Sequence, residues 1–334
     1  MALFGAGVQQ ATQLESELVP HFAMPNGRIP ALAFGSGSKH RVKKTSDPGL
    51  NENIADPHLV EVLSSAINSG YTHLDTAECY TTRLELAMAL KQSGLPRSTF
   101  WITDKYDVGW PDSDAKSRSW SGPKESVEKG LSVGKDSSWE MEYYDLFLLH
   151  SCFFTDETCG VSVEEAWLQL EQLLADGKVK NIGVSNFDVP NLEKIMKVAT
   201  VKPMCNQIEF NIYLQNQSSG IFEYCNDNNI LIEAYCPLTP ILDTKIGKSN
   251  HPLKSIITAI AKNHQVAESS VCLRWIFQSG VIPVTTSSNP ERMKQAFEMF
   301  TFELSPEEYK ELKDVGNSHP VRTMFMEYFD KGEC

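Results

Sequence analysis

The chain has 334 residues, 41% hydrophobic and 22% charged, a composition typical of a soluble globular protein with a large core. Its net charge of −13 argues against nucleic acid or an anionic membrane surface as a partner. No apolar run approaches the ~18 residues of a membrane span, and residues 1–20 have no basic residue ahead of their short apolar patch, unlike a secretory or mitochondrial signal. We therefore expect a cytoplasmic protein.

Strand-like runs alternate with helical patterns along the chain, as in a parallel sheet of βα units. The predicted strands are Leu32–Gly35, His73–Thr76, Trp101–Asp104, Leu146–Leu149, Ile182–Ser185, Asn206–Glu209, Leu231–Tyr235 and Ile282–Thr285. The predicted helices include Pro57–Asn68, Arg83–Ser93, Pro123–Ser132, Val163–Ala175, Val189–Val198, Gly220–Asn228, Leu253–Asn263 and Pro290–Phe297. Eight strands predict a single closed (β/α)8 barrel. We assign residues 20–334 to it, after an N-terminal extension of residues 1–19.

The connections predict where the barrel is closed and where it is open. Asn26-Gly27 between two apolar runs is a strong hairpin signal, and such a hairpin would plug the N-terminal end of the barrel. Long loops are expected at Lys39–Asp56, Lys105–Gly122 and Thr239–Asn250, with a shorter break at Val133–Ser138. Barrel enzymes place substrate contacts on such loops at the opposite mouth.

Several simpler site types are not predicted. Eight cysteines without a CxxC pair indicate buried thiols rather than a disulfide framework. Gly35-Ser36-Gly37 resembles the start of G-x-G-x-x-G, but His40 stands at the third glycine and no helix pattern follows, which argues against a Rossmann site. The histidines show no metal-ligand spacing, so we expect no catalytic metal.

Four titratable residues lie near the ends of strand-like runs: Asp75, Tyr80, Lys105 and His150. Because all strand ends of a parallel barrel face one mouth, we expect these side chains to converge. A free phenol titrates near ~10, but a neighbouring ammonium lowers its pKa and an aspartate holds that ammonium in place. The set predicts an acid site for carbonyl reduction. Asp104 should face away from it, because neighbouring strand residues alternate in direction.

Six motifs in this order resemble the aldo-keto reductase family: GYTHLDTAECY, DLFLLH, GKVKNIGVSNF, NQIEF, EAYCPL and NPER. The resemblance covers roughly Pro20 to the C-terminus. TDKYDVGW, LLHSCFF, FNIYLQNQS, VIPVTTSS and GNSHPVRTMFMEYF resemble more closely the fungal branch containing conjugated polyketone reductases and α-keto amide reductases. The resemblance implies a barrel reductase with NADPH as the expected cofactor and NADH as an alternative.

The cofactor site expected from this resemblance runs around the mouth. Amides and hydroxyls suit a planar carboxamide such as that of nicotinamide, and Tyr235 would stack on the ring as its matching residue does in the family. Thr286 stands where the family motif carries a lysine, which weakens the case for a 2′-phosphate contact, while Arg292 and a helix N-terminus support one. The expected cofactor-binding residues are Gly35, Ser36, Asp75, Ser185, Asn186, Gln207, Tyr235, Cys236, Pro237, Leu238, Thr286, Ser287, Ser288, Asn289, Arg292 and Gln295.

The substrate pocket differs from that of many family members. Gly37 and Ser151 stand where those members carry tryptophans, which should open space beside the reacting carbonyl. The aromatic residues left to stack on a substrate are Tyr106, Trp110, Phe153 and Phe154. A planar conjugated dicarbonyl suits such a pocket better than a sugar.

The sequence thus predicts an NADPH-dependent carbonyl reductase, a monomer or weak dimer, acting on a small molecule such as an α-diketone, conjugated polyketone, α-keto lactone, α-keto amide or aldehyde. Tyr80 would give the proton, Lys105 lower the phenol pKa, Asp75 hold Lys105, and His150 orient the carbonyl. A cofactor-binding sensor or channel subunit without turnover is an alternative. A glycosidase would need paired carboxylates, for which only Asp75 and Glu209 are available.

Overall fold

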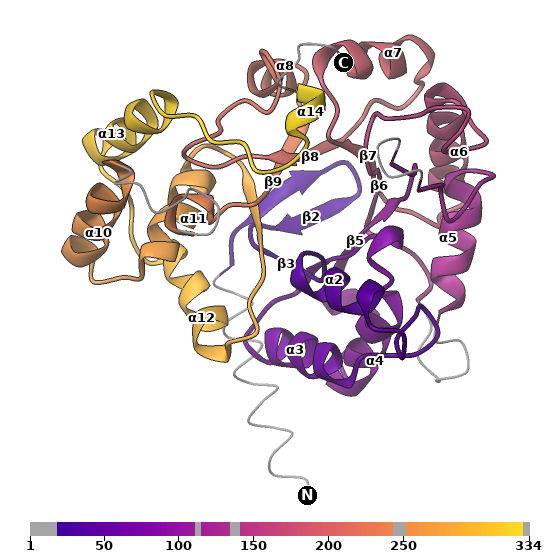
Figure 1. Cartoon of the computed structure of the whole chain (residues 1–334), viewed down its shortest axis with the longest axis horizontal. Helices are drawn as coiled ribbons and strands as arrows, with labels where there is room; N and C mark the ends of the chain where they lie inside the picture. Colours follow the sequence, from indigo (N-terminus) through magenta and orange to yellow (C-terminus); the bar gives the residue numbers. More distant parts are fainter. Residues whose placement is uncertain (1–18, 111–114, 134–140, 243–251, 330–334) are drawn as a thin grey trace, which may run out of the picture.

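The computed structural model describes residues 19–110, 115–133, 141–242 and 252–329. Eight parallel strands close into a barrel in the order β10-β3-β4-β5-β6-β7-β8-β9. They are β3 (Ala33–Gly35), β4 (His73–Asp75), β5 (Trp101–Tyr106), β6 (Leu146–Leu149), β7 (Ile182–Ser185), β8 (Cys205–Glu209), β9 (Leu231–Tyr235) and β10 (Ile282–Thr285). The predicted (β/α)8 barrel is confirmed (Figure 1).

Helices surround the strands (Figure 1). The α-helices are α2 (Lys39–Ser46), α3 (Pro57–Asn68), α4 (Arg83–Ser93), α5 (Pro123–Ser132), α6 (Val163–Ala175), α7 (Val189–Val198), α8 (Ile221–Asp227), α10 (Pro252–His264), α11 (Glu268–Gln278), α12 (Pro290–Gln295), α13 (Pro306–Asn317) and α14 (Met326–Phe329). The predicted bounds are confirmed for α3 to α7 and are one or two residues off for α8, α10 and α12, whereas α2, α11, α13 and α14 were not predicted. The short 3-10 helices are η1 (Glu78–Tyr80), η2 (Arg97–Thr99), η5 (Thr239–Ile241) and η6 (Ala296–Phe300).

Helix α6 shows how local signals fix these elements. Its first turn is closed by a capping box, in which the hydroxyl of Ser162 accepts from the N–H of Glu165 and the Glu165 carboxylate accepts from the N–H of Ser162. Its buried face runs through Trp167, while Leu168 is 48% exposed. Leu168 therefore does not belong to the apolar face, because a helical side chain turns by about 100° from one residue to the next.

A two-stranded antiparallel hairpin closes the N-terminal end of the barrel, as predicted. It consists of β1 (His21–Met24) and β2 (Gly27–Pro30), so that Pro25-Asn26 forms the turn and Gly27, with φ 126, begins the second strand. One apolar cluster joins the hairpin to the lower ends of the strands: Met24, Ile29, Trp101, Leu146, Leu148, Cys205 and Ile282. The opposite mouth, at the C-terminal ends of the strands, is therefore the end that can hold a reaction site.

The loop predictions need correction. The segment predicted as the loop Lys39–Asp56 contains α2, and β5 continues through Tyr106, beyond the predicted strand end. Helix α2 was missed because it has no apolar stripe, with a sequence of KHRVKKTS. Much of the Thr239–Asn250 loop, nearly all of the Val133–Ser138 break and all but Val19 of the extension fall outside the described residues.

Three general expectations can be compared with the described part of the chain. Within it, no helix is long and apolar enough to cross a membrane. The same residues contain no cluster of three or more metal-binding side chains. Five cysteines are buried thiols: Cys79, Cys159, Cys205, Cys225 and Cys272.

Candidate active site

An ion pair lies at the mouth end of the barrel interior. The ammonium of Lys105, in β5, donates to both carboxylate oxygens of Asp75 at 2.7 Å and to the carbonyl of Thr76 at 2.9 Å. These three acceptors use all three ammonium hydrogens. Asp104 faces the other side of the strand, as alternation predicts, and its carboxylate lies 2.8 Å from Nε of Arg83.

A phenol and an imidazole meet beside this pair. Tyr80 ends η1, and its hydroxyl lies 3.4 Å from Nε2 of His150, the residue after β6. The ammonium of Lys105 is 5.4 Å from the centre of the Tyr80 ring. The structure thus brings Asp75, Tyr80, Lys105 and His150 together. Lys105 acts on the phenol by its charge across this distance, since its hydrogens are donated elsewhere.

Burial dominates the acidity of these groups. It raises the pKa of Tyr80, and the charge of Lys105 only partly opposes this rise. The net direction corrects the expectation of a lowered phenol pKa, and it leaves Tyr80 protonated at neutral pH. Burial also holds the pKa of His150 well below its ordinary value, so that ring is neutral. Burial lowers the pKa of Lys105, but the charge and hydrogen bond of Asp75, together with Tyr80 and Glu233, outweigh burial, so the pKa is raised overall.

The space expected at Gly37 is taken up by Tyr80, whereas the space expected beside Ser151 stays a prediction. A Cβ atom on Gly37 would lie 2.9 Å from Cε2 of Tyr80, so the Tyr80 ring already occupies the room that a side chain would need. Ser151 is fully buried, and its hydroxyl accepts from the N–H of Phe153 at 3.4 Å. A side chain at position 37 would therefore require the Tyr80 ring to shift from its place.

The aromatic wall also differs from the expected one. Tyr106 is fully buried among helix-facing side chains, its hydroxyl lies 3.3 Å from that of Ser117, and Phe154 packs 6.3 Å from its ring. Because Tyr106 and Lys105 are strand neighbours, Tyr106 points away from the barrel interior, toward the helices. Tyr106 is thus not placed to contact a substrate.

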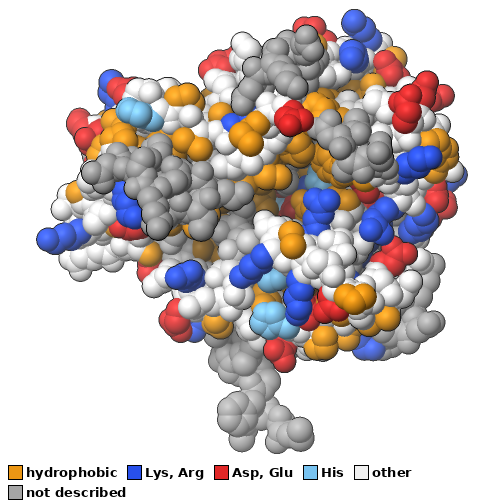
Figure 2. Space-filling view, viewed as in Figure 1, with side chains coloured by type: hydrophobic (Ala, Val, Ile, Leu, Met, Phe, Trp, Pro, Cys, Tyr) orange, Lys and Arg blue, Asp and Glu red, His pale blue; other side chains and the backbone are white. Residues whose placement is uncertain are grey.

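The C-terminal segment supplies rings beyond those predicted for the site. Trp110 stacks on Phe325 at 5.3 Å and 14°, and Phe153 stacks on Tyr328 at 4.0 Å and 21°. The Trp110 ring also lies 5.7 Å from that of His150. Figure 2 shows hydrophobic side chains gathered around a hollow near the centre of this face. The motif GNSHPVRTMFMEYF was a signal for this role, because its rings are close in sequence.

A buried carboxylate holds this segment in place. Glu209, at the end of β8, accepts hydrogen bonds from the N–H and hydroxyl of Thr323 at 3.0 Å and 2.6 Å and from the N–H of Met324 at 3.0 Å. Burial raises the pKa of Glu209, and these donors oppose the shift. We name this arrangement the C-terminal clasp.

The residues expected to bind a carboxamide form one network. Gln207 donates to Asp75 at 2.9 Å, and Ser185 donates to the carbonyl of Gln207 at 2.7 Å. The side-chain oxygen of Asn186, whose φ is 59, accepts from the hydroxyl of Tyr235 at 2.7 Å. The structure thus groups these residues beside the ion pair, with most of their donors directed at one another.

The segment after β10 is the expected phosphate site. Asn289 accepts from the N–H groups of Glu291 and Arg292 at 2.9 Å and 3.3 Å, so the cap of α12 uses donors that were expected to serve a phosphate. The hydroxyl of Thr286 is buried without a hydrogen-bond partner among the described residues. Lys39, at the start of α2, donates to the hydroxyl of Ser288 at 2.8 Å.

The sequence does not indicate that Lys39 belongs to this site, because its segment is predicted to be a loop. No local pattern links Lys39 to Ser288, which is 249 positions away. The other expected cofactor residues are placed around the same mouth. The hydroxyl of Ser36, just after Gly35 at the end of β3, lies 2.8 Å from that of Thr82. Of the remaining positions, Cys236, Pro237 and Leu238 follow β9, Ser287 precedes α12, and Gln295 ends α12.

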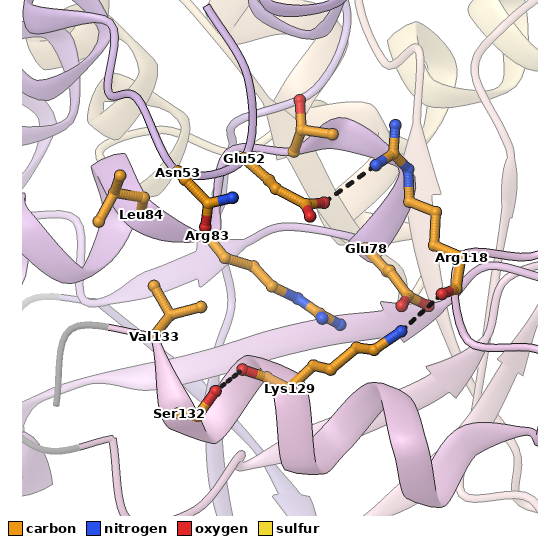
Figure 3. Close-up of a pocket in the computed structure, with 10 residues that line it drawn as sticks. Glu52, Asn53, Glu78, Arg83, Leu84, Arg118, Lys129, Ser132 and Val133 are labelled. Atoms are coloured by element: carbon orange, nitrogen blue, oxygen red, sulfur yellow. Dashed lines mark hydrogen bonds and ion pairs between the residues drawn. The ribbon is translucent and has the colours of Figure 1, made fainter.

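A separate cavity of about 530 Å³ lies outside the barrel, and α4 and α5 contribute to its lining (Figure 3). Its charged side chains pair within the protein: Arg118 with Glu52 at 3.1 Å, and Lys129 with the backbone carbonyl of Arg118 at 2.7 Å. Glu78 reaches its wall, but the carboxylate accepts from buried serines. This cavity therefore offers little unsatisfied charge to a ligand.

Comparisons with known proteins agree with this geometry. The Aldo/keto reductase family profile matches residues 35–317. The chain is 38% identical to the NADPH-dependent alpha-keto amide reductase of Saccharomyces cerevisiae, over 93% of this chain and 95% of the relative. It is 31% identical to the NAD/NADP-dependent indole-3-acetaldehyde reductase of Schizosaccharomyces pombe, over 91% and 97%.

A solved structure shows the same fold. The crystal structure of an aldo/keto reductase from Brucella melitensis aligns with a TM-score of 0.67 and 26% identity, over 89% of this chain and 99% of the other. The family profile, the fungal relatives and the shared barrel are consistent. The chain belongs to the Aldo/keto reductase family.

Proposed function

We propose that this protein reduces a carbonyl group of a small molecule to an alcohol with NADPH. The observation that carries the proposal is the Tyr80 hydroxyl beside Nε2 of His150, next to the buried pair of Asp75 and Lys105. The neighbouring reductases of yeast and fission yeast act on an α-keto amide and an aldehyde by name. A sensor without turnover is disfavoured, because all four groups needed for proton donation are present and converge.

Each residue has a distinct part in this proposal. NADPH supplies the hydride when it is bound. Tyr80 holds the proton that the carbonyl oxygen receives, and neutral His150 orients that oxygen by hydrogen bonding. Lys105 favours the charge that develops on the phenol oxygen, and Asp75 keeps Lys105 charged and in place.

The residues around the mouth fit a dinucleotide phosphate. Thr286 offers a buried hydroxyl that lacks a partner among the described residues, and Ser287 and Ser288 add further hydroxyls. Arg292 and Lys39 supply positive charge there, so Lys39 would take over the role of the missing lysine at position 286. Ser185, Asn186 and Gln207 would bind the carboxamide, with Tyr235 against the nicotinamide ring.

The substrate is proposed to be a planar conjugated dicarbonyl, such as a cyclic α-diketone or α-keto lactone. Support comes from the rings of Trp110, Phe153, Phe325 and Tyr328, which offer flat apolar surfaces near His150. A sugar would need many polar partners that these rings do not provide. We therefore expect kcat/KM for a cyclic α-diketone to exceed that for an aldose by at least ~100-fold. Comparable values for xylose would contradict this substrate class.

The proposed acid can be tested with Tyr80→Phe. Removing the hydroxyl should lower the rate of NADPH-dependent diketone reduction by ~10²–10⁴-fold, the usual contribution of general acid catalysis. The Kd for NADPH, measured by fluorescence, should change little because the ring remains. Tyr143→Phe is the matched control, since its ring contacts Arg97 and Lys180 on the segments that lead into the barrel strands. Activity of Tyr80→Phe within threefold of the parent would refute the assignment.

A further inference from the structure

A second carboxyl group lies inside the barrel near the Asp75–Lys105 pair. Glu233 is in the middle of β9 and is fully buried. The side-chain nitrogen of Gln207 donates to Oε2 of Glu233 at 2.6 Å and to Oδ2 of Asp75 at 2.9 Å. Gln207 therefore connects Glu233 directly to the acid site, although the mechanism proposed above gives Glu233 no role.

The surroundings of Oε1, the other carboxyl oxygen of Glu233, show which neighbouring atoms carry a hydrogen. Nδ1 of His73 lies 3.2 Å from the carbonyl of Pro30, which can only accept, so Nδ1 carries hydrogen. Burial lowers the pKa of His73 to about 3, so the ring is neutral and Nε2 has a lone pair. Nε2 lies 3.0 Å from the hydroxyl of Thr103 and 3.4 Å from Oε1 of Glu233.

An ionised Oε1 would thus face the lone pair of Nε2 in a buried site, whereas a protonated Oε1 would present a hydrogen to Nε2, beside the hydroxyl of Thr103. No hydrogen bond to Oε1 stabilises a negative charge on it among the described residues. Burial and the charge of Asp75 together raise the pKa of Glu233 to about 7. Geometry and electrostatics agree that the carboxyl keeps its proton in mildly acidic solution and titrates around neutral pH.

The titratable groups that face Glu233 determine how loss of its proton affects the acid site. These titratable groups come from β4, β5 and β8: His73, Asp75, Lys105 and Cys205. Its partner strand β10 contributes apolar residues, Ile282 and Pro283. Because burial keeps Cys205 protonated, Asp75 and Lys105 balance each other while Glu233 is neutral. Loss of the Glu233 proton leaves one uncompensated negative charge, which disfavours a phenolate on Tyr80.

We propose that Glu233 holds a proton inside the barrel in mildly acidic solution and that losing this proton as the pH rises through neutrality weakens the acid formed by Tyr80 and Lys105. Glu233 is then a positioning residue that acts through Gln207 and Asp75. Its effect on catalysis rests on the proposed function, whereas the presence of the proton does not.

Infrared difference spectroscopy tests the proton without any turnover. The variant is Glu233→Gln, whose amide oxygen can still accept from Gln207 and whose amide nitrogen can donate to His73. At about pH 6 the parent protein should show the carbonyl stretch of a protonated carboxyl, absent from Glu233→Gln and lost from the parent by about pH 8. The matched control is Glu128→Gln on the exposed face of α5, which should leave that band unchanged. Identical spectra of parent and Glu233→Gln at pH 6 would overturn the proposal.

The pH profile of reduction tests the consequence. The parent kcat should fall about threefold or more between about pH 6 and about pH 8, and this step should be missing in Glu233→Gln. Superimposable profiles would overturn the effect on Tyr80. A parent protein that reduces no carbonyl would refute the proposed function and this effect, while the infrared band would still decide the proton. If Glu233→Gln does not fold, Asp107→Asn and Glu209→Gln remove two other buried carboxyls whose pKa is raised. A band that titrates between pH 6 and pH 8 in both variants supports the proposal, and loss of that band in either variant overturns it.

Discussion

The C-terminal clasp should control how firmly the aromatic wall closes over the site. Glu209 accepts from the N–H and hydroxyl of Thr323 and from the N–H of Met324. In Glu209→Gln one oxygen becomes an NH2 group, which faces N–H donors and cannot accept from them. Hydrogen bonds to charged groups contribute ~1.5–3 kcal/mol each, so we expect the segment 321–329 to open more easily by about 2–3 kcal/mol.

Hydrogen exchange measured by mass spectrometry checks this value. A cost of about 2–3 kcal/mol corresponds to roughly 30- to 150-fold faster exchange in segment 321–329, with little change in the barrel strands. The KM for a dicarbonyl should rise, because Phe325 and Tyr328 lose their fixed positions. Glu171→Gln is the matched control, since Glu171 accepts from the N–H groups of Thr200 and Val201 on the outer face. Exchange in 321–329 within threefold of the parent would refute the clasp.

Three further predictions concern the cofactor, the acid and the buried carboxyl. Arg292→Ala and Lys39→Ala should each narrow the preference for NADPH over NADH, by roughly 1.5–3 kcal/mol for Arg292; equal Kd values for the two cofactors in the parent would contradict this. Gly37→Ala should lower kcat by about 10- to 100-fold by displacing the Tyr80 ring, whereas Gly49→Ala should not. The raised pKa of Glu233 implies stability that is present at low pH and lost as pH rises from about 4.5 to about 7. In denaturant unfolding, the free energy of unfolding of Glu233→Gln relative to the parent should therefore rise by up to about 3 kcal/mol between pH 4.5 and pH 7. A difference that does not depend on pH would count against this prediction.

The barrel could be predicted because its signals are local. Each strand is a short apolar run, and caps such as Asp56 before α3 or Ser162 before α6 mark helix starts. Helix α13 was overlooked although Ser305 and Glu308 form a capping box around Pro306, a pattern that the sequence displays. Helix α2 gave no such signal, because its eight residues are mostly charged or polar.

The site was predictable only in part, for a related reason. Asp75, Tyr80, Lys105 and His150 converge because strand ends of a barrel share one mouth, a rule that needs no distances. The fit of Gly37 under the Tyr80 ring and the contact of Lys39 with Ser288 depend on distances between side chains far apart in the sequence. Patterns along the chain carry no information about such contacts.

Charge balance around the site follows from the alternation of β5. Asp104 stands beside Lys105, but the two side chains lie on opposite faces of the strand, and Arg83 neutralises Asp104 on the helix side. Asp104 therefore does not disturb the pair of Lys105 and Asp75 inside the barrel. Glu233 differs from both aspartates, because its close contacts are the amide of Gln207 and the neutral ring of His73. A buried carboxyl without an adjacent cation is the one expected to keep its proton. The barrel interior can thus hold the carboxyl groups of Asp75 and Glu233 and the ammonium of Lys105 with no net charge. A change in the protonation of Glu233 then acts first on the acid formed by Tyr80 and Lys105.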